Sequence, residues 1–418
     1  MKVFMLGWEF PPFISGGLGT ACYGLSKAMS QMGTQITFVL PRTSSGGSCC
    51  PVKILSTEGC IQANEFENVS FRPIASSLAP YATCGTSEGC RPQKNNFSVF
   101  SWQCASSKCS GNYGGDIYEQ VYRYASKAVE IADLEDFDLI HAHDWMTYPA
   151  AIAVAESRRK PLIVHVHSTE FDRSGENVNQ TIYNVERAGM HIANKVVAVS
   201  QYTKNIIMRH YGVSSGKIET VYNGVECNGS SHGQVVKDFS DKIVLFLGRL
   251  TLQKGPEYFI AAAKKVLEVE ENVKFIMAGD GDMTHRMIEY AASLGIGHKV
   301  FFTGFLRGAD VDRAYEMADL YVMPSVSEPF GIAPLEALKH EVPVLISKQS
   351  GVSEVLQHAL KADFWDIDEL ANKIVSVLRY PPLRTTLREN GHTEVETIRW
   401  EDSAAKVTAI YKQLLACA

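Results

Sequence analysis

The sequence lacks a long apolar run. No stretch of its 418 residues approaches the ~18–20 apolar residues that are needed to cross a bilayer. Met1 and Lys2 lead straight into a short strand-like run, without the longer apolar stretch and the small-residue cleavage site of a secretory leader. We therefore expect a cytoplasmic protein with no transmembrane segment and no association with membranes.

The sequence also lacks an excess of positive charge. Lys and Arg number 40 and Asp and Glu number 46, which gives a net charge of -6. Such a balance provides no general attraction to nucleic acid or to anionic lipid, so we expect no nucleic-acid partner. The content of 45% hydrophobic and 21% charged residues is that of an ordinary globular protein and excludes wholesale disorder.

The ten cysteines include no C-x-x-C pair, although seven of them fall between Cys49 and Cys109. Their irregular spacing disfavours a zinc module, and in a cytosolic chain free thiols are expected. The surrounding segment, about 43–115, is rich in Ser, Gly, Cys and Asn. It is predicted to be an elaboration of the first domain, with strand-like pieces at Val69–Ile74 and Phe97–Trp102.

Short apolar runs alternate with helical patterns in two successive series, which predicts two doubly wound parallel α/β sheets. A polar stretch without hydrophobic periodicity, Cys227–Asp241, separates the series as a linker. We expect domains at 1–230 and 240–397, followed by an amphipathic helix near Trp400–Leu415. The predicted strands are Val3–Gly7, Gln35–Leu40 (ended by Pro41), Leu139–Ala142, Leu162–Val166, Lys195–Val199, Ile243–Leu247, Lys274–Met277, Val300–Phe302, Leu320–Met323 and Val342–Ile346.

Glycines and cations follow several of these strands. In parallel sheets, ligands bind beyond the carboxyl ends of the strands. Gly16-Gly17-Leu18-Gly19 opens a helix after the first strand, where backbone amides favour anions, although it is not a G-x-G-x-x-G fingerprint. Gly248-Arg249 and Lys254-Gly255 place two cations at one strand end, which suits a diphosphate. Taken alone, these features, like Gly279-Asp280, also fit ordinary turns and solvated cations.

The most distinctive local pattern is the run from Ser327 to Glu336. Glu328 lies in a loop after a strand, and the amides of Phe330, Gly331 and Ile332 lie at a helix start. Glu336 falls about one turn into that helix. Carboxylates placed in this way accept hydrogen bonds from sugar hydroxyls while the amides hold an anion. The alternative is that the acids only complement the helix dipole, an effect of ~0.3–1 kcal/mol each.

Two histidine pairs mark strand ends in the first half. His141 and His143 share one face of their strand, and His165 and His167 follow in the next strand. A histidine pair can ligate a metal, but the sequence shows no third ligand at a suitable spacing, so hydrogen-bonded structural histidines are the favoured interpretation. We expect no metal and no cofactor.

Taken together, these motifs resemble those of the retaining glycosyltransferases of the GT-B fold, family four, and are similar to those of bacterial and archaeal glycogen (starch) synthases. The resemblance covers nearly the whole chain except about 43–115. It implies two Rossmann-like domains that face each other across a cleft, with segment 398–418 crossing back to the first domain. The matching pieces are Gly16–Gly19, His143-Asp144-Trp145, Tyr222-Asn223-Gly224-Val225, Gly248-Arg249, Lys254-Gly255, Gly279-Asp280-Gly281 and the pair Glu328 and Glu336.

The resemblance also implies roles for these residues. In the second domain, Arg249 and Lys254 would stabilise the departing diphosphate of a nucleotide-sugar. Glu328, with the amides of 330–332, would hold the sugar and phosphate, and Glu336 would bind the ribose. Gly279 and Asp280 would also bind the nucleotide-sugar donor.

In the first domain, His143 would contact the donor sugar, and the Gly16–Gly19 loop would contact the diphosphate when the domains close. Asn223 lies near the linker and would support closure. The implied catalysis needs no metal ion.

One residue departs from the pattern of the glycogen synthases. Those enzymes usually carry a Lys two residues before Gly-Gly-Leu, whereas Ile14 occupies that position here. The favoured function remains the synthesis of α-1,4-glucan from UDP-glucose or ADP-glucose onto a glycan acceptor. The alternatives are a glycosyltransferase for a surface polysaccharide or glycolipid, a sugar-nucleotide epimerase and a catalytically silent binding protein.

Overall fold

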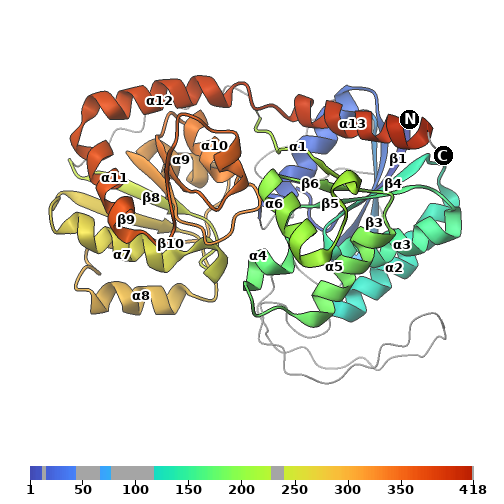
Figure 1. Ribbon diagram of the computed structural model, residues 1–418, viewed down its shortest axis with the longest axis horizontal. Helices are drawn as coiled ribbons and strands as arrows, with labels where there is room; N and C mark the ends of the chain where they lie inside the picture. Colours follow the sequence, from blue (N-terminus) through green and yellow to red (C-terminus); the bar gives the residue numbers. More distant parts are fainter. Residues whose placement is uncertain (12–15, 44–65, 77–116, 227–239, 417–418) are drawn as a thin grey trace.

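The computed structural model describes residues 1–11, 16–43, 66–76, 117–226 and 240–416, which form two α/β domains (Figure 1). Every pair of neighbouring strands in the two sheets is parallel. The predicted pair of doubly wound sheets is therefore confirmed. In this described part of the chain, no helix is both long enough and apolar enough to cross a membrane.

The first sheet has seven strands in the order β3-β2-β1-β4-β5-β6-β7. Its strands are β1 (Lys2–Leu6), β2 (Gln35–Thr43), β3 (Val69–Ser76), β4 (Leu139–His143), β5 (Leu162–Val166), β6 (Lys195–Ala198) and β7 (Ile218–Thr220). The helices between them are α1 (Gly17–Gln31), α2 (Ile117–Leu134), α3 (Tyr148–Arg158), α4 (Glu170–Ser174), α5 (Gln180–Ile192) and α6 (Gln201–Ile206). Strands β4 and β5 are buried along their whole length, which explains why they are apolar apart from their histidines.

The second sheet has six strands in the order β10-β9-β8-β11-β12-β13. These are β8 (Lys242–Leu247), β9 (Val273–Ala278), β10 (Val300–Gly304), β11 (Leu320–Met323), β12 (Val344–Ser347) and β13 (Leu360–Ala362). The helices of this half are α7 (Pro256–Leu267), α8 (Thr284–Ser293), α9 (Ala309–Met317), α10 (Ala333–Lys339), α11 (Ile367–Arg379) and α12 (Pro381–Val395). Helix α7 begins with Pro256 because the missing N–H has no helical partner at that position.

The last helix, α13 (Trp400–Ala416), returns to the first domain and lies beside α1 (Figure 1). Its apolar face, including Trp400 and Tyr411, belongs to the same buried cluster as Met5 of β1 and Leu25 of α1. Gly24 makes this contact possible, because a Cβ there would lie 2.3 Å from the Trp400 ring. The amphipathic pattern of the chain's last segment thus serves to cover one face of the first sheet.

Two sequence predictions need correction. Pro41 does not end its strand, since β2 continues to Thr43 in register with β3. Proline is tolerated there because the pairing with β1 stops at Leu6 and Val39, so the strand has lost its second neighbour. The three-residue edge strands β7 and β13 were not predicted, because such short segments carry too few residues for a recognisable pattern.

The cysteine-rich segment is described only in part. The strand predicted at Val69–Ile74 is present as β3. The strand predicted at Phe97–Trp102, the linker residues 227–239 and Ile14 lie outside the described residues. Of the ten cysteines, only Cys22 lies in the described part, as a buried free thiol.

Candidate functional site

The strand order of each sheet reverses at one place. In the first sheet the order changes direction between β1 and β4, and in the second between β8 and β11. Ligands of open parallel sheets bind beyond the carboxyl ends of the strands at such reversals. The loops that follow these four strands carry most of the residues predicted from the sequence, so the two reversal points define the candidate site.

Lys254 and Glu328 form an ion pair that joins the loops after β8 and β11. Lys254 ends a short 3₁₀ turn, and Gly255 follows in the left-handed region with φ +62°. A Cβ on Gly255 would lie 2.3 Å from the carbonyl oxygen of Pro324, so only glycine lets the two loops approach so closely. The structure thereby brings together two residues separated by 74 positions in the sequence.

The backbone around Glu328 is fixed on both sides. Its N–H donates to the Gln349 carbonyl at 3.0 Å, and its carbonyl accepts from the Gly351 N–H at 2.9 Å. Gly331 adopts φ +99°, and a Cβ there would lie 3.1 Å from Cγ of Glu328. Glycine at this position therefore leaves room for the side chain of Glu328, which is a buried residue.

The residues whose amides are predicted to hold an anion follow Glu328 in the same loop. Phe330 is buried, and Ile332 is the residue directly before α10. Glu336 lies in the first turn of α10 and accepts a hydrogen bond from the Tyr315 hydroxyl at 3.1 Å. Burial raises the pKa of Glu336. The two carboxylates therefore have different partners, a cation for Glu328 and a phenol for Glu336.

The turn after β9 is shaped by close packing. Gly279 adopts φ +138°, and a Cβ there would lie 1.9 Å from the carbonyl oxygen of Gly248. Asp280 accepts hydrogen bonds from the Gly281 N–H at 2.8 Å and the Thr284 hydroxyl at 2.7 Å. These contacts give Gly279 and Asp280 a structural role at the turn. Arg249 follows Gly248 directly after β8 and is half-buried.

The glycines at the start of α1 have no such packing role. A Cβ on Gly16 or Gly17 would meet no described atom within 4 Å. Gly16 precedes the helix without a side-chain cap, and Gly17 is exposed at its first position. Leu18 is half-buried and Gly19 is buried. Among the described residues, the space beside Gly16 and Gly17 at this helix start is therefore open, and their predicted contact with an anion stays a prediction.

His143 ends β4 at the reversal point of the first sheet and is fully buried. Its Nδ1 lies 2.9 Å from Nε2 of His167. The turn is held by Asp144, a non-glycine residue at φ +59°, whose Oδ1 accepts the His167 N–H at 2.7 Å. Burial lowers the pKa of His143 well below 6.5 and that of His167 to about 3, so both rings are neutral.

The sequence shows no third ligand at a suitable spacing beside the histidine pair, but the folded chain brings further nitrogen and sulfur atoms close to it. Strands β4 and β5 pair with His143 opposite His165, which places the second histidine pair beside the first. Cys22 of α1 adds a thiol to this group. Pairing of the two H-x-H segments on adjacent strands was the signal in the sequence, but the contribution of Cys22 required the three-dimensional packing of α1.

Asn223 is buried just before the described part of the first domain ends. The neighbouring Val225 donates its N–H to the Ile398 carbonyl at 3.0 Å. A Cβ on Gly224 would lie 2.3 Å from the backbone nitrogen of Trp400. The two segments that connect the domains therefore run side by side at Asn223.

Two family models match consecutive stretches of the chain. The model described as Glycosyltransferase Family 4 matches residues 112–228, and the model described as Glycosyl transferases group 1 matches residues 230–394. The chain belongs to the GT-B glycosyltransferases. The two matches of this glycosyltransferase meet at the linker, with β4–β7 in the first match and β8–β13 in the second.

Individual proteins resemble this glycosyltransferase over most of its length. An uncharacterized glycosyltransferase from Methanocaldococcus jannaschii is 28% identical over 99% of this chain and 98% of its own. The glycogen synthase of Mycobacterium tuberculosis is 25% identical over 91% of this chain and 87% of its own. The structure of HepE from Anabaena in complex with UDP and glucose superposes with a TM-score of 0.70 at 19% identity, over 99% of this chain and 100% of that one.

Sequence reasoning missed the polar contacts between the two domains of this glycosyltransferase. Ser327, next to Glu328, donates its hydroxyl to Asp172 Oδ1 at 2.6 Å and lies 3.0 Å from the Tyr202 hydroxyl. Ser200 donates to the Pro329 carbonyl. The T-x-x-D capping box that fixes Asp172 at the start of α4 is visible in the sequence, but its partner in the other domain is not.

Proposed function

We propose that this glycosyltransferase transfers a glucosyl unit from a nucleotide-glucose to an α-1,4-glucan, with retention at the anomeric carbon and without a metal ion. The observation that carries this proposal is the Lys254–Glu328 pair at the reversal point of the second sheet. The pair brings a cation and a carboxylate together on adjoining loops, which supports the binding of a phosphate beside sugar hydroxyls.

In this proposal, Lys254 and Arg249 stabilise the nucleoside diphosphate as negative charge develops on it. Both follow β8, where Gly279 packs against Gly248 and Gly255 packs against Pro324. Side chains fixed before the reaction need little reorganisation when charge appears, which makes such stabilisation effective. Lys254 exchanges its partner from the Glu328 carboxylate to the phosphate as the donor binds.

The donor sugar then lies against Glu328 and the amides of residues 330–332. Glu336 binds the ribose hydroxyls. The open helix start at Gly16–Gly19 contacts the diphosphate from the first domain, and His143 contacts the sugar. Hydrogen bonds between the domains at Asp172 and Ser327 support this assignment, because they hold the Glu328 loop against the first domain.

The relatives support the choice of donor and acceptor. The mycobacterial relative that matches 91% of this chain is a glycogen synthase. HepE, which shares the fold, was solved with UDP and glucose. A glucan acceptor and a nucleotide-glucose donor are therefore the substrates to test first.

The test is a panel of UDP-, ADP- and GDP-sugars with glycogen and maltooligosaccharides as acceptors. Released nucleoside diphosphate gives the rate, linkage analysis of the product gives the bonded positions, and the NMR coupling constant of the new anomeric proton gives the configuration. We expect turnover with UDP-glucose or ADP-glucose and a product extended by α-1,4 bonds. Transfer only to a lipid or to another surface-glycan acceptor would overturn the glucan assignment, and an inverted product would overturn retention.

A further inference from the structure

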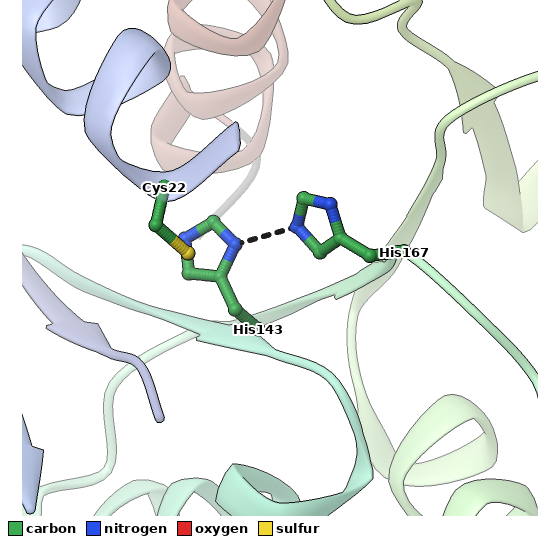
Figure 2. Close-up of side chains that lie close together, drawn as sticks. All are labelled: Cys22, His143 and His167. Carbon is green, nitrogen blue, oxygen red and sulfur yellow. Dashed lines mark hydrogen bonds between the residues drawn. The ribbon is translucent and has the colours of Figure 1, made fainter. Parts of the chain in front are cut away.

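A group of sulfur and nitrogen donors lies where α1, β4 and β5 converge. Cys22, His143 and His167 each offer one ligand atom, and these atoms all lie within 4.8 Å of one another (Figure 2). Cys22 and His143 are fully buried, whereas His167 is half-buried and gives access from outside. Cys22 lies on α1, His143 ends β4 and His167 directly follows β5, so the fold itself brings them together.

A second group, His141, His143 and His165, shares His143 with the first. Its rings are stacked, with centroids 4.4 Å apart at 19° for His141 and His143, and 5.3 Å apart at 28° for His143 and His165. The lone pair of an imidazole nitrogen lies in the ring plane. Rings stacked face to face therefore direct their lone pairs along nearly parallel lines and cannot converge on one ion.

His143 and His167 are arranged differently, because their rings meet edge to edge. Nδ1 of His143 and Nε2 of His167 are 2.9 Å apart, with ring centroids separated by 5.2 Å, so the two nitrogens share a hydrogen bond (Figure 2). A turn of either ring replaces this hydrogen bond by two lone pairs that meet at one ion beside it. The thiol of Cys22 lies beside this pair. The other ring nitrogen of His143, Nε2, is buried and has no hydrogen-bond partner among the described residues.

We propose that Cys22, His143 and His167 bind a thiophilic divalent cation of the Zn²⁺ class, and that its binding inhibits transfer by withdrawing His143 from the donor sugar. One thiolate and two imidazoles form a donor set that selects Zn²⁺ or Co²⁺ over Mg²⁺ or Ca²⁺. Coordination releases the thiol proton to solvent. The proton between the rings moves to the outer nitrogen of one imidazole, so both rings remain neutral.

The neighbouring Asp144 supports such a site. Its carboxylate accepts the backbone N–H groups of His167 and Ser168 at 2.7 and 3.3 Å, which fixes the turn that carries the His167 ring. Groups that orient a ligand in this way contribute to metal affinity. The inhibitory effect rests on the role proposed for His143 in transfer, whereas the binding of the cation does not.

Binding is tested on the full-length protein without substrates. Metal-free protein is titrated with Co²⁺, and the thiolate-to-cobalt charge-transfer absorbance is recorded for wild type, Cys22→Ser and His167→Gln. Cys417→Ser is the matched control, because it removes one thiol outside the described residues. Loss of an orienting partner alone weakens metal affinity by about 10–100-fold, so we expect at least that loss for each ligand variant and none for the control.

Inhibition is measured separately, as donor-dependent transfer in the presence of Zn²⁺ and after chelation. We expect reversible inhibition of wild type and of Cys417→Ser, and resistance of Cys22→Ser. Thermal unfolding shows whether each variant is folded, and His167→Gln supplies a second test if Cys22→Ser is not folded.

Unchanged cobalt binding in both ligand variants would overturn the site. Cobalt binding that depends on Cys22 without zinc inhibition would support the site and overturn its inhibitory role. Absence of transfer with every donor would overturn the proposed function and leave the cobalt result intact.

Discussion

Replacement of Lys254 by methionine keeps the aliphatic stem of the side chain and removes the charge. If Lys254 stabilises the departing diphosphate, the loss should resemble that of one preorganised donor, about 10²–10³-fold in kcat or about 2.7–4 kcal/mol. Arg249→Ala is expected to lower kcat in the same range. Lys264→Met is the matched control, because Lys264 lies on α7 of the same domain with its side chain 41% exposed.

The structure also predicts an effect on stability. The side chains of Lys254 and Glu328 are 22% and 8% exposed, so Lys254→Met leaves a carboxylate with little access to water. Among the described residues, the hydrogen bond that this carboxylate keeps is the one from the Ser325 hydroxyl at 3.3 Å. We expect a loss of about 1–3 kcal/mol in the free energy of unfolding, as for other buried groups deprived of a partner.

The double variant Lys254→Met/Glu328→Gln separates the two effects. It removes the unpaired charge, so stability should recover while kcat stays low. The measurements are initial rates of nucleoside diphosphate release at saturating donor and the midpoint of thermal unfolding. A Lys254→Met enzyme with wild-type kcat would refute the electrostatic assignment. Recovery of kcat in the double variant would show that the loss came from the unpaired carboxylate.

Three further outcomes are expected. EDTA should leave transfer intact, because side chains supply the positive charge at the diphosphate; activity that is lost and restored only by a divalent cation would contradict the metal-free mechanism. Gly331→Ala should lower kcat and cost about 1–3 kcal/mol of stability, because its backbone has φ +99° and its Cβ would press on Glu328; unaltered kinetics would argue against a fixed Glu328. Burial lowers the pKa of His141 and of His167 from 6.5 to about 3, so below pH 6.5 the unfolded chain binds protons that the folded chain does not. The free energy of unfolding should therefore fall below that pH by up to about 1.4 kcal/mol per pH unit for each histidine. Burial raises the pKa of Asp144 to about 7, so below that pH the folded chain binds one proton at Asp144 that the unfolded chain does not. This single group therefore opposes the trend set by the histidines. Urea unfolding at pH 7.5 and 5.5 tests the sign, and equal midpoints would contradict it.

The sequence was most informative where burial is continuous. Strands β5 and β11 have the predicted bounds, Leu162–Val166 and Leu320–Met323, because both are buried along their whole length and bounded by polar loops. Where the pattern of residues along one segment disagreed with the pairing of the strands, the pairing determined where the strand ends. Pro41 lies inside β2 because β3 alone pairs with that part of the strand.

For the site, the sequence located residues but not their partners. The order of residues placed Lys254 and Glu328 at strand ends, yet their ion pair depends on β8 lying next to β11. The contact between Asp172 and Ser327 depends on how the two domains meet. Such contacts join residues far apart in the chain, and periodicity within a single segment carries no information about them.

The course of the chain between the domains has a consequence for engineering. Because α13 belongs to the core of the first domain, the second domain is an insertion within it, entered after Val225 and left before Trp400. The two junctions are adjacent, since Val225 and Arg399 form a parallel bridge. The second domain of a relative can therefore be grafted as one cassette through two neighbouring splice points, leaving the first domain as its own scaffold.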